Sequence, residues 1–141
     1  MKVERTLALT PPPAEVFAYL ADFTTNPEWD PAGVRTTLMS GDGGVGTKYH
    51  NVSTFRGKEA ELVYEVIEHD APRKIVLRGE NESLIAVDTM TFRPTADGGT
   101  ELTYSADFTL KGPLRWFGWV AAPAFKKLGD EAEEGLLSAI G

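Results

Sequence analysis

The feature that most constrains this chain is a helical repeat of apolar residues near its end, over 112–140. Apolar residues recur there at gaps of three and four positions, a spacing that forms one stripe along an α-helix. A helix over the whole segment would be about 40 Å long, and it could not bury such a stripe alone. The rest of the chain must therefore supply the opposing surface. The stripe consists of Leu114, Phe117, Ala121, Phe125, Leu128, Ala132, Leu136 and Ile140.

This predicted helix has two halves of different character, and Pro123 separates them. Gly112 can cap the helix, and Pro113 suits its first position because the N–H that proline lacks has no partner there. Pro123 removes an internal hydrogen bond and clashes with the preceding turn, so the sequence predicts a kink or break near Ala122. The half before Pro123 is aromatic on more than one face, and the half after it is an ordinary amphipathic helix.

The segment before this helix alternates between apolar and polar residues, which is the period of strands. A first strand is predicted over 2–10. The prolines at 11–13 end it, a short helix follows over 14–21, and a second short helical or turn-rich piece extends over 22–30. Turns rich in glycine, aspartate and proline then divide the remaining sequence into six strands, over 34–40, 47–55, 58–69, 74–80, 84–93 and 101–110.

This order of elements predicts one α+β domain over residues 1–141. Short connections favour neighbouring antiparallel strands, so the seven strands should form one antiparallel sheet with one face to bury. A strongly twisted sheet curves around a helix packed on it. We therefore expect the sheet to wrap around the long C-terminal helix, with two short helices after the first strand. Where sheet and helix separate, a cavity is expected.

Charge and composition argue against several classes of function. The formal net charge of −7, with no basic stripe, argues against a nucleic-acid partner. The chain has no cysteine, which removes disulfides, thiolate catalysis and cysteine metal sites. His50 and His69, the two histidines, form no spaced metal motif, so we expect neither a metal nor a cofactor. The absence of a long apolar run predicts no signal peptide and no membrane span, and we expect a cytoplasmic location.

Strand alternation places one set of side chains on the inner face of the sheet. Most of them are apolar or aromatic and a few are polar, which is the usual composition of a small-molecule pocket. The alternative is a filled core, because aromatic and β-branched strand faces are mostly core. The inner-face residues expected to contact a ligand are Tyr49, Asn51, Tyr64, Asp88, Met90, Tyr104 and Phe108.

Asp88 is the sharpest single hypothesis for a catalytic group, and no catalytic residue is assigned beyond this candidate. It lies between Ala86 and Met90 on the predicted inner face. A buried carboxylate is costly unless it is paired, so Asp88 in a cavity would be an acid, a base or a ligand anchor. Two alternatives stay open. A register error of one residue would place Asp88 in solvent, or it could pair structurally with Arg78 or Arg93.

Four short motifs form a family pattern: PAEVFAYLADF at 13–23, NPEWDP at 26–31, VGTKY at 45–49 and GTELTY at 99–104. Together they resemble the START-like, or Bet v1-like, superfamily of helix-grip proteins. More narrowly, the chain resembles the bacterial polyketide cyclase/dehydrase and lipid transport group. The resemblance covers essentially the whole chain and implies an apolar cavity between the sheet and the C-terminal helix. Lipids, sterols, polyketides or other hydrophobic small molecules are the ligands it implies.

The resemblance also implies that the loop carrying Trp29 closes one end of this cavity, and Trp29 is therefore a candidate ligand contact. The alternative is a core anchor that pins the short helices to the sheet. The start of the predicted helix carries more aromatic residues than one buried stripe can hold, namely Trp116, Phe117 and Trp119. Trp116 and Phe117 are expected to contact ligand at the cavity mouth. Docking on a membrane or a partner, or simple burial by the sheet, are the competing uses.

The sequence thus favours a protein that binds a hydrophobic small molecule, lipid or polyketide-like, without assigned chemistry. One alternative is a polyketide cyclase, aromatase or dehydratase, with Asp88, Tyr64 and Tyr104 as acid–base candidates. Another is a partner-binding module that uses the same groove. An enzyme should bring several polar groups with perturbed pKa values together in its cavity. A carrier should have an almost purely apolar lining.

Overall fold

The computed structural model of the chain describes the side chains of residues 1–116 and 122–141. Its strands are β1 (Lys2–Leu9), β2 (Gly33–Ser40), β3 (Lys48–Phe55), β4 (Lys58–Asp70), β5 (Lys74–Glu80), β6 (Leu84–Pro94) and β7 (Thr100–Leu110). The α-helices are α1 (Pro13–Ala21), α2 (Asn26–Trp29) and α3 (Gly118–Ile140), and two short 3₁₀ helices are η1 (Phe23–Thr25) and η2 (Gly112–Phe117).

All seven strands form one antiparallel sheet in the order β1-β7-β6-β5-β4-β3-β2. Consecutive strands from β2 to β7 are neighbours, as short turns require. The segment with α1, η1 and α2 takes the chain from β1, at one edge, to β2 at the other edge. The predicted fold class is therefore confirmed: an antiparallel α+β helix-grip fold with two short helices after the first strand.

The sheet curves because its strands twist and because the hydrogen-bond register between neighbouring strands shifts at several places. The pairing of β4 with β5 shifts between Val66 and Glu68, and that of β2 with β3 shifts near its start. The β3–β4 hairpin turns through Arg56 and Gly57, which both have positive φ, 54° and 78°. A two-residue turn of that kind matches the right-handed twist of the strands that it joins.

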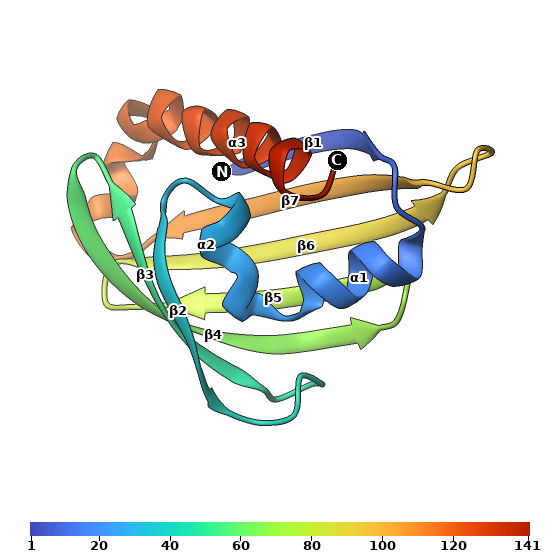
Figure 1. The fold of residues 1–141 in the computed structure, drawn as a ribbon. Coiled ribbons are helices and arrows are strands. Elements are labelled where there is room, and N and C mark those ends of the chain that lie inside the picture. Colours follow the sequence, from blue (N-terminus) through green and yellow to red (C-terminus); the bar gives the residue numbers. More distant parts are fainter.

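Figure 1 shows α1, α2 and α3 on the same side of the curved sheet, with α3 crossing it beside β1. The same arrangement follows from packing, since one apolar cluster combines residues of the three helices with inner-face residues of the strands. Among the described residues, no helix is long and apolar enough to cross a membrane.

The C-terminal segment differs from its prediction in two respects. A single helix was expected from Gly112, but the segment begins as the 3₁₀ helix η2 and becomes α-helical at Gly118. A kink or break was expected near Ala122, and the break is absent because α3 continues through Pro123 to Ile140. Proline removes one hydrogen bond, and the packing of α3 on β1 and α2 holds the turns that follow.

The C-terminal half of α3 lies very close to its neighbours. A Cβ atom added at Gly135 would lie 1.6 Å from the carbonyl oxygen of Trp29, and one at Gly129 would lie 2.1 Å from Val3. Arg5 of β1 donates from Nε and Nη2 to Oδ1 of Asp130, at 3.2 and 2.6 Å. Two glycines and one ion pair therefore fix this half of the helix to α2 and β1.

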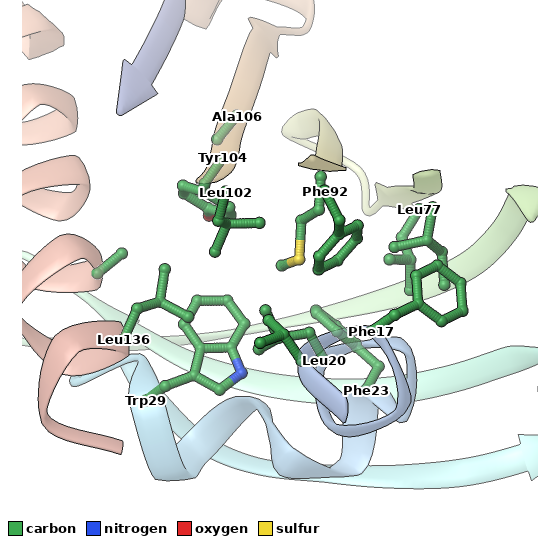
Figure 2. Packing of buried hydrophobic residues seen from close by; sticks show 14 of the residues in the cluster. Phe17, Leu20, Phe23, Trp29, Leu77, Phe92, Leu102, Tyr104, Ala106 and Leu136 are labelled. Atoms are coloured by element: carbon green, nitrogen blue, oxygen red, sulfur yellow. The ribbon is translucent and has the colours of Figure 1, made fainter. Parts of the chain in front are cut away.

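Trp29 is the largest buried side chain in the core, with 1% of its surface exposed. Figure 2 shows its ring with Leu136 of α3 on one side and Leu20 of α1 on the other. The ring also meets that of Tyr104 edge-on, with centroids 5.8 Å apart. Trp29 thus joins the short helices, α3 and the sheet.

Candidate ligand-binding pocket

A pocket of about 490 Å³ opens between the sheet and the first half of α3. It is bounded by residues of β3, β4, β6 and β7, by the segment from η1 to β2, and by η2 and α3. The carbon-lined part of its wall is formed by Val3, Phe23, Phe55, Ala60, Leu62, Leu84, Ala86, Ala106, Phe108, Leu110, Leu114, Phe125 and Leu128. A wall of this kind suits an apolar ligand of drug size.

Three stacked phenylalanine rings connect α3 with the sheet at this pocket. The ring of Phe125 is nearly parallel to that of Phe108, with centroids 4.5 Å apart, and to that of Phe55, at 5.1 Å. Offset-stacked pairs of this kind add about 0.5–1.5 kcal/mol beyond the area that they bury. All three side chains line the pocket, so the stack forms part of its apolar wall.

Amide and hydroxyl side chains form a connected network on another part of the wall. Asn51 of β3 donates from Nδ2 to Thr36 Oγ1 at 2.8 Å and to Asn26 Oδ1 at 3.4 Å. Ser53 donates to Asn51 Oδ1 at 2.7 Å. Gly33 passes beside this network, where an added Cβ would lie 2.5 Å from Asn26 Oδ1. Asn26, Asn51 and Ser53 line the pocket, so they offer oriented polar atoms beside its apolar surface.

Asp88 of β6 lines the pocket and is 5% exposed, so the predicted register of β6 is the one observed. It has no hydrogen-bond or ion-pair partner among residues 1–116 and 122–141. The alternative pairings with arginine are wrong, because Arg78 binds Glu80 at 2.9 Å and Arg93 lies 4.0 Å from Glu101. Burial, together with the negative charge of Asp30, raises the pKa of Asp88 to about 7.

A second carboxyl group, that of Asp30, lies on the wall of the same pocket. It follows the last residue of α2 and accepts a hydrogen bond from Ala32 N at 3.0 Å. Burial raises the pKa of Asp30, and the charge of Glu131 adds to this, whereas hydrogen bonds from Ala32 and Asn26 oppose it. The two carboxyl groups therefore differ in the number of hydrogen-bond donors around them. Asp30 has donors that stabilise its charge, and Asp88 has none in the described part of the chain.

Tyr64 of β4 and Tyr104 of β7 add two hydroxyl groups to this carboxyl pair. The two residues are 8% and 6% exposed, and neither hydroxyl has a hydrogen-bond partner among the described residues. Burial, followed by the charge of Asp88, raises the pKa of both phenols well above the ordinary value. Both hydroxyls thus stay protonated at neutral pH and can donate to a ligand or accept from it.

The ring of Tyr64 is positioned by a glycine on the neighbouring strand. Tyr64 pairs with Gly79 of β5. A Cβ atom added at Gly79 would lie 2.7 Å from ring carbons Cε1 and Cζ of Tyr64. The phenol therefore lies against the bare backbone of β5, and any larger residue there would displace it.

The structure divides the predicted ligand contacts into two groups. Asn51, Tyr64, Asp88, Tyr104 and Phe108 line the pocket together. The others do not: Trp29 and Met90 are buried in the core, Tyr49 lines a separate groove beside α1, and Trp116 is 69% exposed. The Trp116 ring instead lies beside Arg115, whose guanidinium carbon is 5.0 Å from the ring centroid. Phe117 lies outside the residues whose side chains are described.

Asp30 and Phe125 are among the pocket residues that the sequence prediction of the site missed. Asp30 lies in the NPEWDP motif, where it reads as a turn residue between two prolines. Phe125 belongs to the predicted apolar stripe and was assigned to packing against the sheet. No local signal marks Asp30 as a pocket residue, because the sequence alone does not show which strands the end of α2 approaches. Within the described residues, no three His, Asp or Glu side chains meet in a way that would hold a metal ion.

Comparison with solved structures supports the fold. A Thermus thermophilus protein, TTHA0849, superposes with a TM-score of 0.79 at 20% identity, covering 99% of this chain and 93% of that one. The Zhui aromatase/cyclase from Streptomyces sp. R1128 has a TM-score of 0.79 at 15% identity, covering 99% and 90%. A START superfamily protein from Mycobacterium smegmatis has 0.75 at 17%, covering 98% and 92%. Identities this low show a shared fold and do not transfer an activity.

Among curated protein sequences, none matches the chain significantly. The sequence profile of one family, described as polyketide cyclase / dehydrase and lipid transport, matches residues 1–138. That match covers nearly the whole chain, and the neighbouring structures share its fold. The chain therefore belongs to the polyketide cyclase/dehydrase and lipid transport family.

Proposed function

We propose that this protein binds a hydrophobic small molecule, lipid or polyketide-like, in the pocket between the sheet and α3. The observation that carries the proposal is the combination of a carbon-lined pocket of about 490 Å³ with three buried, unpartnered polar groups on its described wall, those of Asp88, Tyr64 and Tyr104. The apolar wall supplies affinity through the area it removes from water. The polar groups orient the ligand, because each of them gains a partner when a complementary group binds.

A second candidate function, acid–base catalysis on such a ligand, is favoured by one specific observation. The pocket holds two carboxyl groups in unequal surroundings, Asp30 with hydrogen-bond donors and Asp88 without them. Unequal surroundings allow one group to act as a base while the other remains a neutral acid. In this reaction Asp30 would take a proton from the carbon beside a ligand carbonyl, and Asp88 would donate a hydrogen bond to the carbonyl oxygen, as Tyr64 and Tyr104 could.

The polar groups in the pocket favour a catalytic function more strongly than the sequence alone does. An almost purely apolar lining was the expected mark of a carrier, and the pocket instead gathers two carboxyls and two phenols with raised pKa values. Perturbed groups of this kind cluster at functional sites, although structural networks perturb pKa values too. Ligand binding is common to both functions and remains the primary proposal.

Binding is tested by filling the pocket. Ala106 of β7 lines it and is 3% exposed, so Ala106→Trp should place an indole in the space that a ligand needs. We expect this variant to lose at least about tenfold in affinity for Nile red, a neutral hydrophobic dye followed by its fluorescence. Thr109→Trp, at an exposed position of the same strand, is the matched control and should bind as the unmodified protein does.

Circular dichroism verifies that each variant is folded, and Ala60→Trp, at a half-buried lining position, replaces Ala106→Trp if that variant does not fold. Undiminished dye binding by a folded pocket-filled variant would show that the ligand site is elsewhere. Native mass spectrometry of the freshly purified protein, followed by organic extraction, then identifies any ligand that it retains.

Catalysis is tested separately with 2-acetylnaphthalene in D₂O. Proton abstraction beside its carbonyl would exchange deuterium into the methyl group, which NMR detects. The unmodified protein should accelerate this exchange, and Asp30→Asn should abolish the acceleration while still binding Nile red. If the protein binds Nile red but does not accelerate the exchange, the proposal of acid–base catalysis is rejected and ligand binding remains.

A further inference from the structure

The charges that face the pocket are unbalanced. Asp30 and Asp88 both line it, and Glu131 of α3 lies close enough to Asp30 to raise its pKa. Arg78 and Arg93, the two arginines expected as partners of Asp88, are engaged with other carboxylates. No described residue forms an ion pair or hydrogen bond with Asp88. The inner wall therefore has an excess of acidic groups.

Arg56 is the one cationic side chain on the pocket wall within the described residues. It belongs to the β3–β4 turn, is exposed, and holds its guanidinium 5.9 Å from the ring centroid of Phe55. Its charge does not contribute to the pKa of Asp88, which burial and Asp30 determine. The rim thus carries a cation, and the interior does not neutralise its own carboxyl groups.

The unpartnered oxygens on the pocket wall suit a ligand with hydrogen-bond donors. Asp88, Tyr64 and Tyr104 are each at least nine-tenths buried, line the same pocket and lack partners among the described residues. An ammonium group has three donors and no acceptor, so it can satisfy one carboxylate oxygen and two phenol oxygens together. Its positive charge would also offset the electrostatic cost of ionising Asp88.

We propose that the pocket selects amphiphilic amines, with the ammonium group at Asp88, Tyr64 and Tyr104 and the apolar part against the Phe55–Phe125–Phe108 stack. This inference rests on the proposed binding function and specifies its ligand class. A fatty acid or another anionic amphiphile would instead bring one more negative charge beside Asp30 and Asp88. The net charge of −7 acts in the same direction, because it attracts cations toward the protein over longer range.

Three ligands of nearly equal shape test the proposal: 2-naphthylmethylamine, 2-naphthylmethanol and 2-naphthoic acid. Isothermal titration calorimetry at pH 7 measures their affinities for the full chain. We expect the amine to bind about tenfold to a hundredfold more tightly than the alcohol, which is the usual contribution of a hydrogen bond to a charged group. The acid should bind more weakly than the alcohol.

The same titrations also detect protons that the protein releases when it binds a ligand. When an ammonium ion lowers the pKa of Asp88, the protein releases protons, so the amine's binding heat should change between buffers of different ionisation enthalpy. Binding of the alcohol should show no such dependence. Besides Asp88, the titratable and charged groups that face this site are Asp30, Tyr64, Tyr104 and the more distant Glu131 and Arg56.

Two variants test whether Asp88 is the source of the preference for the amine. Asp88→Asn should reduce the amine's affinity to that of the alcohol and remove the proton release. Glu59→Gln removes one negative charge from an exposed position of β4 and should leave the ligand ranking unchanged. If Asp88→Asn does not fold, the ranking of the three ligands on the unmodified protein still decides the question.

The outcomes separate this inference from the proposed function. Equal affinities for the three ligands, or the tightest binding by the acid, would reject amine selection and leave hydrophobic binding intact. An amine preference that persists in folded Asp88→Asn would also reject the assignment of the site. A pocket that binds neither Nile red nor any of the three ligands would reject both proposals.

Discussion

Replacing Asp88 by asparagine should change how the stability of the protein depends on pH. Asp88 is buried, and its pKa is raised from 3.8 to about 7 by burial and by the charge of Asp30. Asparagine has nearly the same shape and no charge. The variant therefore removes the cost of ionising this group while it preserves most of the packing around it.

The sign of the effect follows from proton linkage. Below pH 3.8 Asp88 is protonated in the folded and the unfolded chain, so its ionisation has no effect on stability. Between 3.8 and about 7 the unfolded chain ionises while the folded protein keeps the proton, so the free energy of unfolding falls as pH rises. Above about 7 the loss is complete.

The size of the loss follows from the same two values. Each pH interval of one unit is worth about 1.4 kcal/mol, and the range from 3.8 to about 7 therefore corresponds to about 4 kcal/mol. Between pH 5 and pH 8 the free energy of unfolding of Asp88→Asn should rise relative to the unmodified protein by about 2–3 kcal/mol.

Urea denaturation at pH 5, 6, 7 and 8, followed by circular dichroism, measures this difference. Groups that do not interact with Asp88 affect both proteins equally and cancel in the comparison, and the charge of Asp30 is already included in the raised pKa of Asp88. Glu59→Gln, which removes an exposed carboxylate of β4, should follow the unmodified protein across the whole range. If Asp88→Asn does so as well, Asp88 is already ionised in the folded protein, and the argument for its unpartnered burial is refuted.

Two further predictions concern glycines at close contacts. Gly135→Ala would place a Cβ 1.6 Å from the Trp29 carbonyl oxygen, so we expect a loss of about 3 kcal/mol or more in urea denaturation, whereas exposed Ser138→Ala on the same helix should change little. Gly79→Ala should lower stability by about 1–3 kcal/mol by displacing the Tyr64 ring. This loss should shrink in a Tyr64→Ala background, and equal losses in both backgrounds would contradict the contact.

The strands were predictable because alternation and turn chemistry act locally. Each predicted strand overlaps an observed one, and the inner-face assignment of Asp88 required nothing beyond the period of two in β6. Register is strongly specified where one face is buried. The same local reasoning also placed Tyr64 and Tyr104 on the inner face, where they line the pocket with Asp88.

The start of α3 was less predictable because helical periodicity does not distinguish an α-helix from a 3₁₀ turn over a few residues. The apolar spacing of the predicted helix begins at Leu114, yet the segment Gly112–Phe117 forms the 3₁₀ helix η2. Similarly, sequence could not separate the aromatic residues that fill the core from those that line a pocket. Trp29 and Met90 are core, whereas Phe108 and Phe125 are pocket wall, because that distinction depends on the distance between sheet and helix.

Asp30 was missed for a related reason. Its role depends on a tertiary approach between the end of α2 and the inner face of the sheet, which involves strands that follow much later in the chain. Local chemistry predicts the turn that Asp30 forms with Ala32. It does not predict that this turn would face Asp88.

The uneven attachment of α3 has a consequence for how proteins of this family can change. Gly135, Gly129 and Asp130 hold the later turns of the helix against α2 and β1, whereas Phe125 and Leu128 of the earlier turns face the pocket. Substitutions at the earlier turns can therefore reshape the pocket while the attachment survives. Under the proposed binding function, one scaffold can change its ligand in this way as its sequence changes. A randomised library confined to those turns would be the natural starting point for engineering new specificities.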